Sequence, residues 1–263
     1  MSSNSTYLLL NQPLDYFYSG HKGGLIISWD METAKIRANL NAHKSEIKSI
    51  SLANGGNGNN ILASGSADGK IKLWDSRGKS ACISLKGHLE SVNCVSLSPD
   101  CNYLASGAND NLLKLWDIRQ NKLLKDLTVP DQTSVNCVEF NPHCITIAYG
   151  SNKSVKHWDL ERYELISQTP MDKLPAVKLS FDTSGKNLFI GTNEGFKYFM
   201  IDDEKPEFID MFEAGFNNLQ DICFRDNEGL YGNLSIYLII FSCFCLFFKN
   251  FKMVFPTRKI RRK

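Results

Sequence analysis

The stretch "LASGSADGKIKLWDS" (Leu62–Ser76) decides the fold, because the chain repeats it. A close copy, "LASGANDNLLKLWD" (Leu104–Asp117), starts 42 residues later. In both copies short runs of mixed apolar and polar residues are separated by Gly, Asn and Asp, which favour turns. The pattern therefore predicts short strands joined by tight turns, and not helices.

Each copy ends in a Trp-Asp pair, and such pairs occur at Trp29–Asp30, Trp74–Asp75, Trp116–Asp117 and Trp158–Asp159. The intervals between them are 45, 42 and 42 residues, and the chain has no other tryptophan. A further step of 42 residues reaches Met200 in "LFIGTNEGFKYFMID", which we interpret as a fifth repeat without its tryptophan. A period of about 40–45 residues is typical of the blades of a β-propeller.

The predicted fold class is therefore all-β, with five four-stranded blades and part of a sixth. We place the blades at residues 1–41, 42–86, 87–128, 129–170 and 171–212, with a partial blade at 213–232. Residues 1–232 then form the propeller domain, and residues 233–263 form a separate tail. The longer first interval contains "NGGNGNN" (Asn54–Asn60), a turn insertion whose Gly and Asn tolerate positive φ.

Charge is distributed unevenly along the 263 residues, which include 30 basic and 28 acidic side chains. Residues 249–263 carry seven basic residues and no acidic one, so the rest of the chain has a net charge of −5. A body of that sign attracts nucleic acid poorly, and we expect no nucleic-acid partner. Eight cysteines without a Cys-x-x-Cys pair, behind an N-terminus that lacks signal-peptide features, predict reduced thiols in the cytoplasm.

Catalytic motifs are missing from the sequence, which has no phosphate-binding loop and no zinc-ligand spacing. A Ser, His and Asp recur together in two adjacent repeats, which a structural device explains and a single active site does not. We therefore predict a protein that is not an enzyme and needs no cofactor or metal.

The repeats around Trp74 and Trp116 resemble WD40 repeats. In that family a His, a Ser or Thr, an Asp and the Trp form a buried hydrogen-bonded set in each blade. Linking these groups avoids the free-energy cost of burying each one unpaired. The resemblance implies two complete sets in this chain, His43, Ser64, Asp68 and Trp74, and His88, Ser106, Asp110 and Trp116.

The remaining three repeats match this pattern only in part. Their Ser and Asp positions hold Ser19 and Gly23 in the repeat of Trp29, Ala148 and Asn152 in that of Trp158, and Ile190 and Glu194 in that of Met200. We expect these flanking blades to depend more on apolar packing.

The run "SVNCVEFNPHCITIAYGSNKSVKHWDLERYELIS" (Ser134–Ser167) resembles the non-catalytic WD40 subunit of katanin, the microtubule-severing complex. This resemblance covers about residues 6–232 and implies a scaffold that targets the severing ATPase to microtubules and to centrosomes or spindle poles. The implied partners are the catalytic ATPase subunit of katanin and microtubules, in the cytoplasm and cytoskeleton. That family has more blades and a helical C-terminal region, so we expect a truncated chain and an open ring.

An alternative function comes from the motif Trp-Asp-x-Arg, which occurs at Trp74–Arg77 and Trp116–Arg119. This motif resembles the adaptor-docking box of substrate receptors of cullin-type ubiquitin ligases. Arginine at this position is also common in WD40 repeats, so a general protein-interaction scaffold stays open as well.

The tail contains a fifteen-residue apolar run, Leu234–Phe248 ("LSIYLIIFSCFCLFF"), and no acidic residue. As a helix the run spans only about 22 Å of a ~30 Å bilayer core, so we do not expect a membrane partner. It is interpreted either as a strand of the sixth blade or, preferably, as translated A/T-rich non-coding sequence. A candidate basic contact patch follows it, formed by Arg258, Lys259, Arg261, Arg262 and Lys263.

Overall fold

The computed structural model describes residues 5–10, 16–55, 59–75, 81–129, 132–171, 175–182, 184–193, 195–200, 207–213, 221–226, 234–242 and 245–253. Within these residues the secondary structure consists of strands, which form six antiparallel sheets and no helix. The chain divides into two compact units, Met1–Ala176 and Val177–Lys263.

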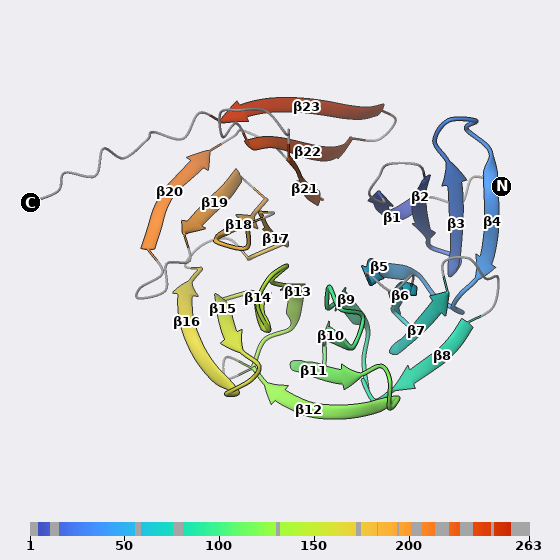
Figure 1. The fold of residues 1–263 in the computed structure, drawn as a ribbon, viewed down its shortest axis with the longest axis horizontal. Coiled ribbons are helices and arrows are strands. Elements are labelled where there is room, and N and C mark those ends of the chain that lie inside the picture. The colour runs from blue at the N-terminus through green and yellow to red at the C-terminus, as the bar shows by residue number, and fades with distance from the viewer. Residues whose placement is uncertain are drawn as a thin grey trace, which may run out of the picture. The chain divides into compact units, whose positions relative to one another are not determined.

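The first unit contains four sheets, and each is built from four consecutive strands. These strands are β1 (Ser5–Leu10), β2 (Tyr16–His21), β3 (Leu25–Asp30) and β4 (Ile36–Asn41); β5 (Ile47–Gly55), β6 (Asn59–Ser66), β7 (Lys70–Asp75) and β8 (Ala81–Lys86); β9 (Val92–Leu97), β10 (Tyr103–Ala108), β11 (Leu112–Asp117) and β12 (Lys122–Thr128); and β13 (Val135–Phe140), β14 (Thr146–Ser151), β15 (Ser154–Asp159) and β16 (Glu164–Pro170). In Figure 1 the first strand of each sheet lies innermost and the fourth lies outermost. The four-stranded blades predicted from the repeat are confirmed.

The second unit contains a fifth four-stranded sheet and a sheet of three described strands. Its strands are β17 (Lys178–Phe181), β18 (Asn187–Gly191), β19 (Gly195–Met200) and β20 (Glu207–Glu213), followed by β21 (Asp221–Asp226), β22 (Leu234–Ser242) and β23 (Cys245–Met253).

The apolar run of the tail forms strands, which agrees with its interpretation as a strand of the sixth blade and not with a boundary of the domain at residue 232. β22 pairs with β21, and β23 pairs with β22 in a continuous antiparallel register. An apolar run that lacks Gly and Pro can form a strand as well as a helix. Strand pairing provides hydrogen-bond partners for its backbone N–H and C=O groups. No helix in the described part of the chain is long and apolar enough to cross a membrane. The basic residues Arg258–Lys263 lie outside the described residues.

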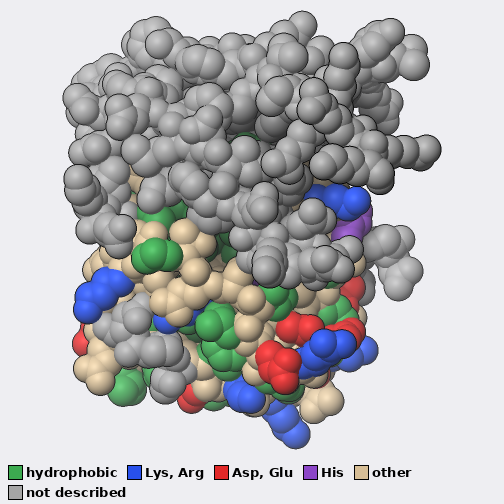
Figure 2. Space-filling model, turned by 90° about the vertical axis from the view of Figure 1, so that its left-hand side faces the viewer, with side chains coloured by type: hydrophobic (Ala, Val, Ile, Leu, Met, Phe, Trp, Pro, Cys, Tyr) green, Lys and Arg blue, Asp and Glu red, His purple; other side chains and the backbone are tan. Residues whose placement is uncertain are grey.

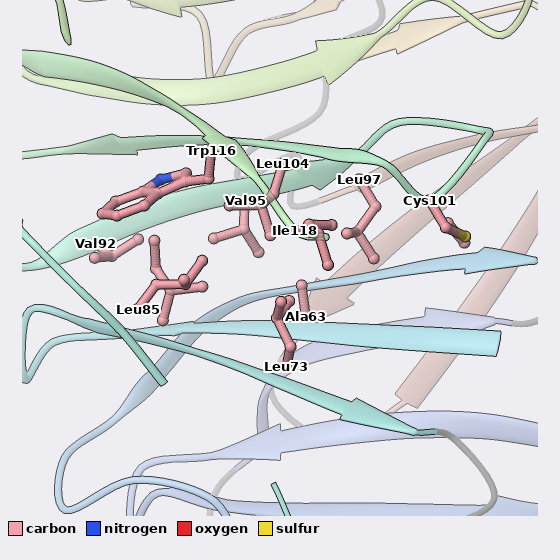
Figure 3. Close-up of a cluster of buried hydrophobic side chains, with 12 residues drawn as sticks. Ala63, Leu73, Leu85, Val92, Val95, Leu97, Cys101, Leu104, Trp116 and Ile118 are labelled. Carbon is pink, nitrogen blue, oxygen red and sulfur yellow. The ribbon is translucent and has the colours of Figure 1, made fainter. Parts of the chain in front are cut away.

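Apolar side chains fill the spaces between neighbouring sheets of the first unit. Figure 3 shows one such cluster, in which Leu73 and Leu85 of the second sheet lie near Leu104 and Trp116 of the third. Trp74 packs in the same way with residues of the first sheet. Each of these tryptophans thus joins its own blade to the blade before it.

Glycines in the second strands let adjacent sheets approach closely. A Cβ atom on Gly107 would lie 2.3 Å from Cγ1 of Val135, and one on Gly65 would lie 2.8 Å from Cγ1 of Val92. Both valines belong to the first strand of the following sheet. A larger residue at either glycine would force the sheets apart.

Side-chain hydrogen bonds join the innermost strands of successive sheets, although these strands belong to different sheets. The hydroxyls of Ser49 and Ser51 on β5 accept hydrogen bonds from the amides of Val95 (3.2 Å) and Leu97 (3.0 Å) on β9. Ser96 on β9 accepts one from the amide of Phe140 on β13 at 3.2 Å. These bonds set the relative height of successive blades.

Candidate functional site

The second sheet brings His43, Ser64, Asp68 and Trp74 together in one chain of hydrogen bonds. The indole Nε1 of Trp74 donates to Oγ of Ser64 at 3.1 Å, and Nε2 of His43 lies 2.9 Å from the same hydroxyl. Nδ1 of His43 lies 3.1 Å from Oδ1 of Asp68. His43 precedes β5, whereas Asp68 lies in the turn between β6 and β7, so the set ties the entering loop to its own blade.

The third sheet contains the same arrangement with His88, Ser106, Asp110 and Trp116. The indole of Trp116 donates to Oγ of Ser106 at 2.8 Å, and Nε2 of His88 lies 2.8 Å from that hydroxyl. Nδ1 of His88 lies 2.9 Å from Oδ2 of Asp110, which also accepts from the amide of Leu89 at 3.0 Å.

Proton positions in both sets follow from the acceptors. An ionised carboxylate can only accept, so Nδ1 of each histidine carries the proton and Nε2 accepts from the serine hydroxyl. Burial lowers the pKa of His43 and of His88 below the ordinary value, although the neighbouring carboxylates oppose this effect. Burial alone would raise the pKa of Asp68, but His43 and the amides of Lys70 and Lys44 lower it. Both histidines are therefore neutral at pH 7.

These sets are suited to holding loops, not to nucleophilic catalysis. Ser64 and Ser106 are each 0% exposed, and each hydroxyl is enclosed between an indole and an imidazole. A nucleophilic serine must reach a substrate carbonyl, whereas these hydroxyls bond inward. The sets instead fix the loops that enter the second and third blades.

The first sheet forms a partial set with a histidine that the sequence pattern missed. Trp29 donates to Oγ of Ser19 at 2.8 Å, as Trp74 and Trp116 do to their serines. Nε2 of His21 lies 3.0 Å from that hydroxyl, where a histidine of a preceding loop lies in the second and third sheets. Residues i and i+2 of a strand share a face, so Ser19 and His21 could have been paired from their spacing.

In the fourth sheet the strand register corrects the position assigned to Ala148. Ile147 pairs with Trp158 as Leu104 pairs with Trp116, so Tyr149 occupies the place of Ser106. The turn between β14 and β15 is one residue shorter than the turn between β10 and β11. Counting back ten residues from the tryptophan therefore reaches Ala148 and not Tyr149.

The consequence is a fourth blade without a hydrogen-bonded set of the same kind. The buried Nε1 of Trp158 has no hydrogen-bond partner among the described residues. Asn152, placed by sequence at the Asp position, instead accepts from Nδ2 of Asn136 at 2.8 Å, as Asn109 does from Asn93 at 2.7 Å.

In the fifth sheet the register places Phe199, and not Met200, at the tryptophan position. Leu188 pairs with Phe199 as Leu104 pairs with Trp116. The bulge that falls just before Trp116 in the third sheet falls just before Phe199 here. Ile190 lies in β18, and Glu194 lies outside the described residues.

The aspartates that follow the tryptophans hold the turn to the outermost strand. Oδ1 of Asp30 accepts from the amide of Thr33 at 2.8 Å, and Oδ1 of Asp117 accepts from the amide of Gln120 at 2.9 Å. The amide of Arg162 bonds Asp159 in the same way and lowers its pKa. Each turn then contains one residue of positive φ, namely Ala34 (54°), Asn121 (54°) and Tyr163 (55°).

Other candidate positions are more scattered. Arg119 is exposed in the turn after β11, whereas Arg77 lies outside the described residues. Groups of three or more His, Cys, Asp or Glu that could hold a metal are not found in the described part of the chain.

The comparison with protein families finds three repeats, at residues 34–75, 79–117 and 121–159, that match the family described as "WD domain, G-beta repeat". They include the two tryptophans whose hydrogen-bonded sets are complete, and Trp158.

Several curated proteins are similar to parts of the chain. The rice (Oryza sativa subsp. japonica) "U3 snoRNP-associated protein-like YAOH" is 30% identical over 110 residues, which is 36% of this chain and 21% of that protein. "WD repeat and SOCS box-containing protein 1" of Xenopus tropicalis is 32% identical over 83 residues, 31% of this chain and 19% of that protein. "Autophagy-related protein 16" of Arabidopsis thaliana is 36% identical over 69 residues, which is 26% of this chain and 13% of that protein.

The matched part of the chain thus spans about a fifth or less of the length of these relatives. In this chain the matched repeats form four-stranded sheets whose tryptophans recur at one place in the register. Residues 34–75, 79–117 and 121–159 of this chain are therefore WD40 repeats.

Proposed function

We propose that the chain is a non-catalytic scaffold that binds other proteins. The observation that carries this proposal is the pair of buried sets, which use the Ser, His and Asp of two blades to fix loops. Rigid loops on a repeated framework suit recognition, because little conformational entropy is lost when a partner binds. The similar proteins carry names from three different processes, which supports a general interaction platform more than any single partner.

A katanin-type regulatory subunit is the more specific proposal, and it depends on the resemblance of Ser134–Ser167. The run Trp158–Tyr163 within that segment spans the end of β15 and the turn to β16, where Asp159 accepts from the amides of Glu161 (2.7 Å) and Arg162 (3.1 Å). On this proposal the chain binds the severing ATPase and acts at microtubules, centrosomes or spindle poles.

Co-sedimentation with microtubules tests the microtubule part of this proposal. The chain without residues 249–263 has a net charge of −5, so we expect weak binding that depends on the basic end and falls with added salt. Binding at physiological salt that survives deletion of residues 249–263 would show that the basic patch does not contribute to microtubule binding.

A substrate receptor of a cullin-type ligase is the second proposal, and Arg119 supports it. This arginine is exposed, and the neighbouring turn is held by the bond from Gln120 to Asp117. Purified chain should be mixed separately with the katanin ATPase and with the ligase adaptor. Capture of the adaptor that is lost in Arg119→Ala and kept in the matched variant Lys122→Ala favours the receptor. Capture of the ATPase by both variants favours the katanin subunit, and capture of neither leaves the general scaffold.

A further inference from the structure

Exposed apolar side chains concentrate on the outer rim of the third and fourth sheets. Nine large hydrophobic side chains are exposed among the residues with described side chains, and six belong to these two sheets. We call these six the rim patch: Leu123, Leu124, Ile145, Tyr163, Leu165 and Ile166. Figure 2 faces the side of the molecule where β16 lies in Figure 1, and its described part shows hydrophobic side chains with charged ones beside them.

A lysine side chain joins the two halves of the rim patch. Nζ of Lys125 on β12 lies 4.1 Å from the ring centroid of Tyr163, in the turn before β16. The amide of Leu160 donates to the carbonyl oxygen of Ile145 at 3.0 Å, which brings Ile145 beside that same turn. Lys125 thus links β12 to the turn before β16, and exposed apolar side chains gathered on two neighbouring blades indicate an interaction site.

The strand register shows how a partner can bind there. Leu124 and Ile166 are the extra residues of the bulges in β12 and β16. In the first two sheets the equivalent residues are Arg37 and Cys82. A bulge in an outermost strand blocks pairing with another strand, so this surface suits side-chain packing and not strand addition.

Charge divides the rim patch into two borders of opposite sign. The third sheet contributes the exposed cations Arg119, Lys122 and Lys125, while its Asp126 is already paired with Lys114 at 2.6 Å.

The fourth sheet contributes the exposed anions Glu161 and Glu164. The amide and the charge of its cation Arg162 both lower the pKa of Asp159, so this turn carries one cation against the three carboxylates of Asp159, Glu161 and Glu164.

A twofold axis through such a patch would bring the basic border of one molecule onto the acidic border of the other. Interfaces of twofold dimers must be self-complementary in this way. We propose that the rim patch is the interface between two copies of this chain. This proposal goes beyond the scaffold function and does not depend on it.

Sedimentation velocity over a concentration series tests the proposal with the full-length chain. We expect a reversible dimer, and we expect Leu124→Asp and Ile166→Asp each to raise the dimer dissociation constant at least about tenfold. Leu89→Asp is the matched control, because Leu89 is 89% exposed and lies outside the patch. A monomer at every soluble concentration, or a dimer that only Leu89→Asp disrupts, overturns the proposal.

Charge reversal identifies the pairing across the axis. Lys122→Glu and Glu164→Lys should each weaken the dimer, and the double variant should restore it, because each reversed charge again faces an opposite charge. Circular dichroism of all variants confirms that they fold. A double variant weaker than both single variants would show that these two borders do not meet, and capture of a different protein by a monomeric chain would assign the patch to that partner instead.

Discussion

At the scale of single residues, the tryptophans differ in what their indole N–H groups contact. Trp116 donates to Ser106 at 2.8 Å, whereas the buried Nε1 of Trp158 has no partner among the described residues. Replacement by Phe removes a made hydrogen bond in the first case and an unsatisfied donor in the second. We expect Trp116→Phe to lower the free energy of unfolding by about 1–2 kcal/mol more than Trp158→Phe does.

Urea denaturation of the two variants and the parent chain measures this difference. Trp74→Phe should behave as Trp116→Phe does, because Trp74 makes the same bond to Ser64 at 3.1 Å. Equal losses at Trp116 and Trp158 would show that the hydrogen-bonded set contributes nothing beyond apolar packing.

A second prediction at this scale concerns pH and His157. This side chain is 4% exposed, and burial lowers its pKa from 6.5 to about 4. The unfolded chain therefore takes up a proton near pH 6.5 that the folded chain refuses until about pH 4. The stabilisation is complete above pH 6.5 and declines as the pH falls toward 4, by on the order of 3 kcal/mol.

Denaturant unfolding at a series of pH values measures this decline, with His157→Gln as the comparison. The variant should lose less stability between pH 6.5 and pH 4 than the parent, since its side chain does not titrate. Parallel curves for the two proteins would contradict the assignment to His157. Other groups whose pKa values are lowered, among them His43, His88 and Asp68, contribute to any slope that remains.

At the scale of elements, the packing of β10 against β13 depends on a single glycine. A Cβ on Gly107 would lie 2.3 Å from Cγ1 of Val135, so Gly107→Ala must displace a strand. We expect it to destabilise the fold by about 1–3 kcal/mol. The control is Gly23→Ala, because a Cβ there meets nothing within 4 Å and should leave the thermal midpoint almost unchanged.

The turns that lead to the outermost strands carry a second element-scale prediction. Ala34 has a φ of 54°, a conformation that glycine adopts without the steric strain of a Cβ. We expect Ala34→Gly to stabilise the first sheet by up to about 1 kcal/mol. The greater conformational entropy of glycine in the unfolded chain offsets part of this gain. Ala38→Gly within β4 should instead destabilise it, and thermal melts of both variants would show opposite signs.

At the scale of the whole molecule, stability should be highest where the complete hydrogen-bonded sets lie. The second and third sheets contain both of these sets, and their inner strands are joined by Ser49 and Ser51. Hydrogen exchange should therefore be slowest in β5–β7 and β9–β11, and faster in the first blade and beyond residue 213. Uniform protection of all blades would instead indicate a closed ring with no weak end, contrary to the open ring predicted from the sequence.

The sequence by itself determined the repeat and its short strands, and its resemblance to WD40 repeats identified the residues of the two complete sets. The repeat and its strands depend on local signals, because the Trp-Asp pairs, the glycines and the turn residues recur at nearly fixed spacing. Tertiary structure decided which residues occupy the equivalent positions where the spacing of the repeat changes. A turn shortened by one residue places Tyr149, and not Ala148, at the position equivalent to Ser106, and the bulge position assigns Phe199 in place of Met200. The rim patch also exists only in three dimensions, since it joins strands about one repeat apart whose side chains meet across the gap between two blades.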